Sequence, residues 1–570
     1  MAIMPQPSRW VLAERFPEVE SVLVDALGIS PVVAALLSQR GITEPAEADK
    51  FLHPKLSDLH DPTLLPDYEA AKIEILGARE RGELIYIHGD YDVDGVTSTA
   101  TLHRFLGTVG ANVQSHVPHR MREGYGINLS AVEAAKQQGA KVFLTCDCGI
   151  SAYEQVEAAK EAGMRVVVTD HHAVGSELPQ AHAVVNPHRT DSKYPFSELS
   201  GAGVVFKLCA GLTRELGHNV DNFYRAYLDL AALGTVADVM PLHDENRIIA
   251  KFGLERLEDT KKAGLRALKE VADVKPPLRT YHIGFQLGPR INAVGRMDDS
   301  DLALRLLLEN DYGEAMKLAL EIDTYNVERK DAQQRMIDEA VEMVESQGLA
   351  SNYIIALGHE EWHSGIVGLV AGRLVERYNR PAFCFVIDRA RGIYKGSARS
   401  IPAFSLIDAI RQFPDLIEGG GHTMAAGCAF KISDFDAVSK LLDGFARSVL
   451  KPEDLAPAYA ADLEVDPGSL SLEVMEQVAM LEPFGNSNPE PIFVSRNLDL
   501  TSIKPTRNPA HVQLQFRGQD GKMVPASGFN MGARFAESRP GQKIDVLFRS
   551  EIDTYSGRRV KWTLKDFAEV

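Results

Sequence analysis

Acidic and histidine side chains follow three short apolar runs of the chain, at positions where they could bind metal ions. They are His88, Asp90, Asp92 and Asp94 after residues 84–87, Asp147 after residues 142–144, and Asp170, His171 and His172 after residues 166–168. Three aspartates at alternate positions repel one another unless a cation compensates their charge, and hard divalent cations prefer oxygen ligands. An EF-hand calcium loop does not fit, because its twelfth-position glutamate is missing and an apolar strand precedes the loop where a helix would stand. The pattern therefore predicts a site for divalent cations of another kind.

The elements that must position these side chains are those of a doubly wound α/β domain. From about residue 70 to 240, short apolar runs alternate with helical patterns, which is typical of repeated βαβ units and a parallel sheet. Ligands of such sheets gather beyond the carboxyl ends of the strands. We expect a helix to begin near Val96, and a later helix over residues 228–233 to break at Gly234-Thr235 and to present Asp238 as a further acid.

Length and composition predict a cytoplasmic protein of several domains. With 570 residues the chain exceeds what one hydrophobic core supports, so we expect three or more structural units. Apolar residues make up 45% of the chain, yet they form no run long enough to cross a membrane. The first residues lack the pattern of a secretory signal. Five scattered cysteines fit reduced thiols better than disulfides.

The net charge of −18 argues against nucleic-acid binding only when it is taken alone. Between residues 501 and 570, twelve lysines and arginines outnumber seven aspartates and glutamates. Short alternating apolar runs predict a small β-barrel or sandwich in this region. Its basic excess, together with Phe516, Phe529, Phe548 and Trp562, is typical of an OB-type module on which bases stack. The alternative is a plain β domain whose aromatic residues form the core.

The intervening stretches complete the predicted order of domains. Residues 301–347 keep helical spacing, apart from a break near Asp311, and predict a long connector helix. A second α/β region follows from about residue 350 to 450. The predicted parts are an N-terminal segment (1–65), a doubly wound α/β domain (66–300), the connector helix (301–348), a second α/β domain (349–455) and a β-rich domain (456–570).

Four of these segments resemble the ordered motifs of the DHH phosphoesterase superfamily. They are residues 88–95, 145–149, 170–172 and 234–238. Residues 419–422 resemble the glycine-rich motif of the DHHA1 domain, and residues 397–399 resemble its phosphate-binding loop. With an OB-like barrel at the end, the order of parts is similar to that of the RecJ family of single-strand DNA exonucleases. The resemblance implies an α/β multidomain fold: a DHH domain with a parallel sheet, a connector helix, an α/β DHHA1 domain and a C-terminal OB-like β-barrel.

The resemblance also implies roles for individual residues. Two Mn²⁺ or Mg²⁺ ions would be held by Asp92, Asp94, Asp147, His171 and Asp238, with Asp147 between the two ions. His172 would orient or stabilise phosphate, and the roles of His88 and Asp90 stay open. Contacts with DNA or phosphate are implied for Arg120, Arg296, Ser397, Arg399, Gly420, Gly421 and His422. Two cations a few ångströms apart assist phosphodiester hydrolysis by activating water and neutralising the phosphate.

The implied activity is that of an exonuclease that degrades single-stranded DNA from 5′ to 3′, releases 5′-mononucleotides and serves DNA repair and recombination. The implied partners are a strand with a 5′-phosphate end, a single-strand-binding protein and a helicase. Two alternatives remain: a DHH enzyme for short oligonucleotides, cyclic dinucleotides or polyphosphate, and a scaffold that kept the fold without the chemistry. The basic β domain argues against the first, and the intact set of acids and histidines argues against the second.

Overall fold

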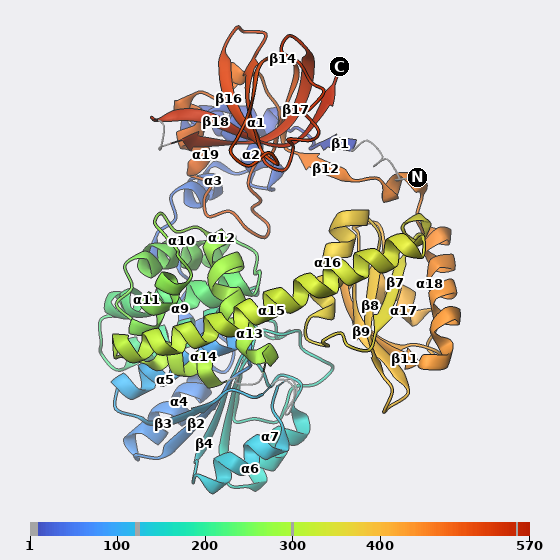
Figure 1. Ribbon diagram of the computed structural model, residues 1–570. Coiled ribbons are helices and arrows are strands. Elements are labelled where there is room, and N and C mark those ends of the chain that lie inside the picture. The colour runs from blue at the N-terminus through green and yellow to red at the C-terminus, as the bar shows by residue number, and fades with distance from the viewer. Residues whose placement is uncertain (1–8, 120–125, 298–300, 554–556) are drawn as a thin grey trace. The chain divides into compact units, whose positions relative to one another are not determined.

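The computed structural model describes residues 9–119, 126–297, 301–553 and 557–570, without the side chains of residues 296 and 297. These residues divide into two compact units (Figure 1). One unit holds residues 12–325 and 461–570, and the other holds residues 9–11 and 326–460. Within the described part of the chain, every helix is too short or too polar to span a bilayer.

A five-stranded parallel sheet forms the centre of the first α/β domain. Its strands are β2 (Leu84–His88), β3 (Asn112–His116), β4 (Val142–Cys146), β5 (Arg165–Thr169) and β6 (Ala183–Val185), in the order β3-β2-β4-β5-β6. Every residue of β4 is buried, which explains its unbroken apolar sequence, since both faces of such a sheet are covered. The predicted parallel sheet is confirmed, including the strands that precede the acidic residues.

Helices cover both faces of this sheet (Figure 1). On one face, Ile85 and Ile87 pack in a hydrophobic core with α4 (Tyr68–Glu80), α5 (Val93–Thr108) and α8 (Gly201–Glu215). On the opposite face, Tyr86 and Phe143 pack with α6 (Leu129–Gln137) and α7 (Tyr153–Glu161). Further helices are α9 (Val220–Ala237), α10 (Asp244–Glu258), α11 (Ala263–Val271), α12 (Thr280–His282), the π-helix η3 (Ile283–Leu287), α13 (Gly288–Met297) and α14 (Asp301–Leu308).

Two boundaries differ from the prediction. Helix α5 begins at Val93, three residues before the expected Val96, because the Asp92 side chain caps its first turn. Helix α9 continues through Gly234-Thr235 to Ala237, so the predicted break there is wrong. Gly234 lies at a close helix contact, where the absence of a side chain matters more than the low helix propensity of glycine.

The long connector helix is confirmed as α15 (Tyr312–Ser346), which contains the boundary between the two units. Beyond it lies a five-stranded sheet with the order β10-β11-β9-β8-β7. The strands are β7 (Ile355–His359), β8 (Ala382–Asp388), β9 (Ile393–Arg399), β10 (Glu418–Gly421) and β11 (Ala425–Lys431), and the helices are α16 (Val367–Tyr378), α17 (Leu406–Arg411) and α18 (Phe435–Val449). This is the second α/β region that the sequence predicts.

The C-terminal strands form a closed barrel, because β14 pairs with both β15 and β17. The elements are β13 (Leu463–Glu464), α19 (Leu472–Ala479), β14 (Phe493–Pro505), β15 (Val512–Arg517), β16 (Met523–Gly528), β17 (Lys543–Asp553) and β18 (Arg559–Glu569). The N-terminal helices α1 (Pro17–Leu27), α2 (Pro31–Gln39) and α3 (Pro45–Leu52) share the barrel's hydrophobic core, and β1 (Arg9–Leu12) pairs with β12 (Ala458–Ala461).

Three of the four aromatic residues that could stack on bases lie inside this barrel. Phe516, Phe548 and Trp562 are fully buried, so the prediction that they stack on a strand is wrong and the alternative of core aromatics holds for them. Closing the barrel turns alternate side chains of each strand into a common core. Phe529 is 55% exposed and could contact a strand.

Candidate metal centre

The predicted acids lie at the topological switch point of the parallel sheet. Strands β2 and β4 are neighbours, and the chain proceeds from them in opposite directions, to β3 on one side and to β5 on the other. In open α/β sheets, ligands bind outside the carboxyl ends of the strands at such a point. Asp90 and Asp92 follow β2, Asp147 follows β4, and His171 follows β5.

Three groups of potential ligand atoms form here, with the atoms of each group within 4.8 Å of one another. The groups are Asp147 with His171 and His172, Asp94 with His171 and Asp238, and Asp90 with Asp92 and Asp147. Because Asp147 and His171 each belong to two groups, the three form one continuous cluster. His171 Nε2 lies 3.1 Å from Asp147 Oδ1 and 3.6 Å from Asp238 Oδ2. The fold therefore brings all the predicted metal ligands together.

Asp94 is held by the N-terminus of α8. Its Oδ2 accepts a hydrogen bond of 2.6 Å from the Gly201 amide, and its Oδ1 accepts one of 2.8 Å from the Ala202 amide. The amides and the dipole of a helix N-terminus favour a carboxylate. A side chain is excluded at Gly201, because a Cβ there would lie 2.6 Å from the Cβ of Asp147. Gly234 is equally confined, since its Cβ would lie 2.5 Å from Asp94 Oδ1.

Backbone geometry fixes the other acids. Asp92 caps α5 through a 3.0 Å hydrogen bond from the Gly95 amide to its Oδ1. Asn292 of α13 supports the same turn, because its Oδ1 accepts a hydrogen bond of 3.2 Å from the Val93 amide. Asp147 adopts a left-handed backbone conformation with φ 60°, and its amide donates to Thr169 O. Such conformations persist where the surroundings impose them, which is common at functional sites.

Asp170 positions the two histidines. Its Oδ1 accepts hydrogen bonds from both histidine amides and lies 2.7 Å from His172 Nδ1, while its Oδ2 accepts one from the Ile150 amide. These donors lower the pKa of Asp170 although burial opposes the shift. Burial alone would lower the pKa of His172, but the hydrogen bond to Asp170 raises this pKa to about 9. His172 therefore carries a positive charge near neutral pH.

The cluster carries more negative charge than its buried surroundings can stabilise. Burial, reinforced by neighbouring carboxylates, raises the pKa of Asp94 and Asp147 well above the usual value. Burial and the charge of Asp92 raise the pKa of Asp90 and of Asp238 to about 7. Burial lowers the pKa of His171 to about 4, so its imidazole is neutral and can act as a metal ligand.

The donor set fits hard divalent cations. Carboxylate oxygens dominate it, a neutral imidazole completes it, and Mg²⁺ and Mn²⁺ prefer such ligands. Asp90 Oδ1 is buried and has no hydrogen-bond partner among the described residues, which is the expected state of an oxygen reserved for a cation. His88 belongs to none of the groups that the described residues form; its ring stacks on Phe143 and lies 3.3 Å from Gly126 O.

The predicted phosphate-binding residues of the other unit lie in adjacent rows of its sheet. They are Ser397 and Arg399 on β9, Gly420 and Gly421 on β10, and His422 directly after β10. Ser397 and Gly420 both pair with Gly427 of β11 and so occupy one row. A Cβ at Gly420 would meet nothing within 4 Å, so packing does not require glycine there and its backbone stays accessible. At Gly421, with φ 139°, packing and conformation both require glycine.

The N-terminus of α16 adjoins this group. A Cβ at Gly368, in the first turn of α16, would lie 3.1 Å from Arg399 Nη2 and 3.4 Å from the Cβ of Ser397. Backbone amides at a helix N-terminus, a guanidinium and a hydroxyl together suit an anion. Arg120 lies outside the described residues, and so does the side chain of Arg296, whose backbone belongs to α13.

Sequence reasoning missed two residues of the site and an exposed aromatic pair before α13. Gly201 and Ala202 bind Asp94 across more than a hundred positions, and only the run of small residues from Ser200 to Gly203 hints at a close contact. Tyr281 and Phe285 are 56% and 68% exposed, stacked with ring centroids 5.0 Å apart, and lie just before α13. Their spacing of four residues on a helix was the available signal.

Three successive regions of the chain match known families: the DHH family, N-terminal domain (residues 84–235), the DHHA1 domain (349–448) and the RecJ OB domain (461–566). Fold and site thus define a metal-dependent phosphoesterase of the DHH type. The chain is 39% identical over 555 residues to the single-stranded-DNA-specific exonuclease RecJ of Bacillus subtilis strain 168, which covers 97% of this chain and 69% of that protein. The chain belongs to the RecJ family.

Two crystal structures of RecJ from Thermus thermophilus are similar to this structure. The complex with Mn²⁺ has a TM-score of 0.82 and 30% identity, covering 99% of this chain and 80% of that chain. The complex with Mg²⁺ has a TM-score of 0.77 and 29% identity, covering 99% and 79%. These are the two cations that the sequence predicts for this chain, which supports the donor-set argument.

Proposed function

We propose that this chain is a Mn²⁺- or Mg²⁺-dependent exonuclease that degrades single-stranded DNA from its 5′ end and releases 5′-mononucleotides. The observation that carries this proposal is the continuous cluster of acids and histidines around Asp147 at the switch point of the sheet. Membership of a family whose relatives are named single-stranded-DNA-specific exonucleases supports the choice of substrate. Repair and recombination of DNA are the processes in which such an activity would act.

The cluster would hold two cations through Asp92, Asp94, Asp147, His171 and Asp238, with Asp90 as an additional ligand. When bound, the cations supply Lewis acidity toward the phosphate and lower the pKa of water. Asp147 links the two halves of the site, and the amides of α8 keep Asp94 oriented. His172, held by Asp170, would direct a positively charged ring toward a phosphate oxygen.

Ser397, Arg399 and the N-terminus of α16 would bind the 5′-phosphate of the strand, with the amides near Gly420 and the His422 side chain as further donors. Arg120 and Arg296 would add phosphate contacts. Replacing Arg399 by alanine should reduce the preference for a phosphorylated over an unphosphorylated 5′ end. Initial rates on the two oligonucleotides measure that preference, and an unchanged ratio would remove Arg399 from this role.

Tyr281 and Phe285 would stack on bases of the approaching strand. Tyr281 lies eleven positions before Asn292, whose side chain binds the turn of Asp92, and this spacing corresponds to roughly 17 Å along a helix. Base stacking on an exposed aromatic ring contributes about 1–3 kcal/mol. Phe285→Ala should weaken the binding of a dT oligonucleotide and leave the hydrolysis of a dinucleotide unchanged. Equal losses on both substrates would instead indicate a structural role.

A single-strand-binding protein and a helicase are the partners that we propose for this activity, and the cytoplasm is the proposed compartment. The five cysteines are buried and unbridged, as expected in a reducing compartment. Co-purification of the chain with either partner, sensitive to substitutions on the exposed surface, would test these contacts.

The decisive experiment is a Mn²⁺-dependent time course on a 5′-phosphorylated single strand labelled at its 3′ end, beside the blunt duplex and a dinucleotide. We expect rapid conversion of the single strand to mononucleotides while the duplex is spared. Activity on the dinucleotide alone would favour a DHH phosphodiesterase for short substrates. Binding of Mn²⁺ without hydrolysis of any of the three would favour a scaffold.

A further inference from the structure

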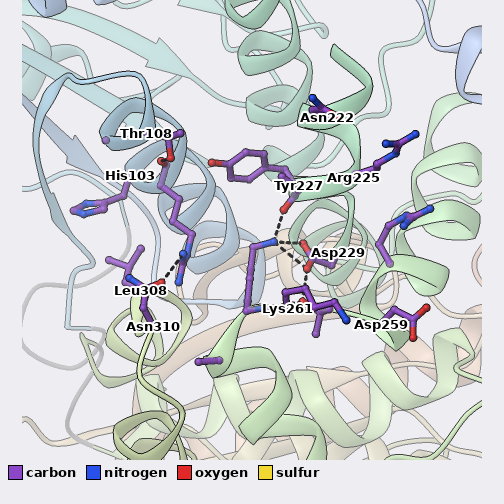
Figure 2. A pocket seen from close by; sticks show the side chains of 17 residues that line it. His103, Thr108, Asn222, Arg225, Tyr227, Asp229, Asp259, Lys261, Leu308 and Asn310 are labelled. Atoms are coloured by element: carbon purple, nitrogen blue, oxygen red, sulfur yellow. Dashed lines mark hydrogen bonds and ion pairs between the residues drawn. The ribbon is translucent and has the colours of Figure 1, made fainter. Parts of the chain in front are cut away.

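A charged cleft lies beside α5 and α9, and none of the metal-ligand residues lines it (Figure 2). Its volume is about 960 Å³, which is within the range of small-molecule sites. The C-terminal end of α5, the N-terminal part of α9 and the chain between α10 and α11 line it. Figure 2 shows His103, Leu308 and Asn310 on one side of the cleft and Arg225 and Asp259 on the other.

The lining is basic, although the whole chain carries a net charge of −18. Five side chains of the lining are positively charged and two are negatively charged. Part of this charge is structural. Lys262 Nζ lies 2.7 Å from Asp229 Oδ1, and Arg104 donates to Leu307 O and to Asn310 Oδ1. These contacts neutralise the buried Asp229 and secure the end of α14.

Three other cations of the cleft are not committed in this way. Arg225, Arg256 and Lys261 are exposed, and among the described residues none of them has an acidic partner within salt-bridge distance. Asp259 is the one acid of the described lining without a bonded cation, and it cannot balance three positive charges. Like charges grouped on three separate elements repel one another, and an anion shared between them would relieve that repulsion.

The start of α11 adds to the attraction for an anion. Lys262 occupies the N-cap position, where Ser, Thr, Asp or Asn usually accepts an amide hydrogen, and no side chain caps the first turn. A positive side chain is also unfavourable beside the positive end of the helix dipole. Ala263, the first residue of α11, lines the cleft. An anionic ligand would satisfy the uncapped amides and the grouped cations together.

The cleft is distinct from the proposed catalytic site. Helix α5 carries Asp94 in its first turn and Thr108 of the cleft at its last residue, which places them roughly 20 Å apart along the helix. Helix α9 (Val220–Ala237) carries Arg225 of the cleft in its second turn, and Asp238 of the cluster directly follows its last residue, which is a similar separation. A group bound in the cleft therefore cannot be the scissile phosphate.

We infer that this cleft binds a small anion with two or more phosphate groups, held by Arg225, Arg256, Lys261 and the first turn of α11. One phosphate group carries at most about two negative charges near neutral pH, so balancing three cations takes more than one. The amide side chains of Asn222 and Asn310, which also line the cleft, could orient the remainder of such a ligand. This inference does not depend on the proposed nuclease activity.

The test is isothermal titration calorimetry of the full, metal-free chain with inorganic pyrophosphate at low salt. We expect one binding event whose affinity falls as salt is added. The triple variant Arg225→Gln/Arg256→Gln/Lys261→Gln should bind about tenfold more weakly or worse, because each removed cation loses a charge-assisted hydrogen bond. All three side chains are exposed, so the variant should unfold at the temperature of the unmodified chain.

A matched control removes the same charge elsewhere. Lys141→Gln/Arg335→Gln/Lys440→Gln changes three exposed cations outside the cleft and should bind pyrophosphate as the unmodified chain does. The Arg399→Ala variant should also keep this binding. The inference would be overturned if Arg399→Ala lost pyrophosphate binding while the cleft variant kept it. No pyrophosphate binding, with cleft-dependent binding of a dT oligonucleotide, would also overturn it in favour of a strand-binding surface.

Discussion

Helices α5 and α9 run between two sites of opposite charge, the metal-ligand cluster and the basic cleft. At one end the acids are buried and braced, since Asp94 and Asp147 are 1% and 2% exposed and the amides of α8 hold Asp94. At the other end Arg225 and Lys261 are exposed and unbraced. Buried carboxylates held by hydrogen bonds suit a metal ion in a defined geometry. Exposed cations without such partners suit a ligand that exchanges with solvent. The difference separates a centre suited to catalysis from one suited to reversible binding.

The largest expected effect is the loss of one braced acid. Asp147→Ala should reduce the hydrolysis of single-stranded DNA more than about a hundredfold, because even outer-shell partners of metal ligands contribute about 10- to 100-fold. Asp259→Asn, which removes an acid from the lining of the basic cleft, should leave the rate unchanged. Steady-state rates of hydrolysis by the two folded variants measure this difference. Similar rates would show that the acid of the cluster matters no more to catalysis than the acid of the cleft.

The acidic end should also make the effect of cations depend on pH. In the metal-free chain the pKa of Asp90 and of Asp238 is raised from 3.8 to about 7, so the stability linked to these groups is present at low pH and is lost as pH rises through 7. Mn²⁺ at one hundred times its dissociation constant adds about 2.7 kcal/mol. Because metal ligands must be deprotonated, thermal unfolding at one fixed Mn²⁺ concentration should show a larger gain from Mn²⁺ at pH 8 than at pH 6. An equal gain at both values would argue against carboxylate ligands.

The tight packing beside Asp94 can be tested at Gly234 of α9. Gly234→Ala at the acidic end would place a methyl group 2.5 Å from Asp94 Oδ1, so we expect about 1–3 kcal/mol of destabilisation and weaker Mn²⁺ binding. Chemical denaturation and a Mn²⁺ titration provide the two readouts. Unchanged Mn²⁺ affinity would show that the close contact does not position Asp94.

The smallest effect is expected at the other end of α5. Gly107 has nothing within 4 Å of its Cβ position and lies in the helix, so Gly107→Ala should stabilise the chain by about 0.5–1 kcal/mol. Its Mn²⁺ affinity should not change. A destabilised variant would mean that the basic end is packed as tightly as the acidic end.

The parts of the site that follow strands were predictable from the sequence. Continuous apolar runs identify β2, β4 and β5, and the carboxyl ends of parallel strands meet at one edge, which brings Asp92, Asp147 and His171 together. These inferences need only local pattern and a general rule of sheet topology. Local pattern also identified Asp238 as a further acid, but it predicted a break at Gly234-Thr235, whereas α9 continues to Ala237.

Features that depend on contacts between distant segments were not predictable. The hydrogen bond from the Gly201 amide to Asp94 joins residues 107 positions apart. The low helix propensity of Gly234 predicted a break, whereas packing requires a small residue within the helix at this position. Phe516 and Trp562 are buried because the barrel closes on itself. The alternation of apolar residues does not by itself determine which face of a strand is buried. The basic cleft likewise unites three elements that no short sequence window contains.

The central claim is that the cluster of acids and histidines around Asp147 holds the catalytic cations. Electron paramagnetic resonance of free Mn²⁺, during titration of the metal-free chain, measures the number of ions bound. We predict two ions per chain, and we predict that Asp147→Asn, which keeps the size of the side chain, loses tight binding because Asp147 belongs to two ligand groups. Absence of tight binding in the unmodified chain, or identical titrations of the two proteins, would contradict the account.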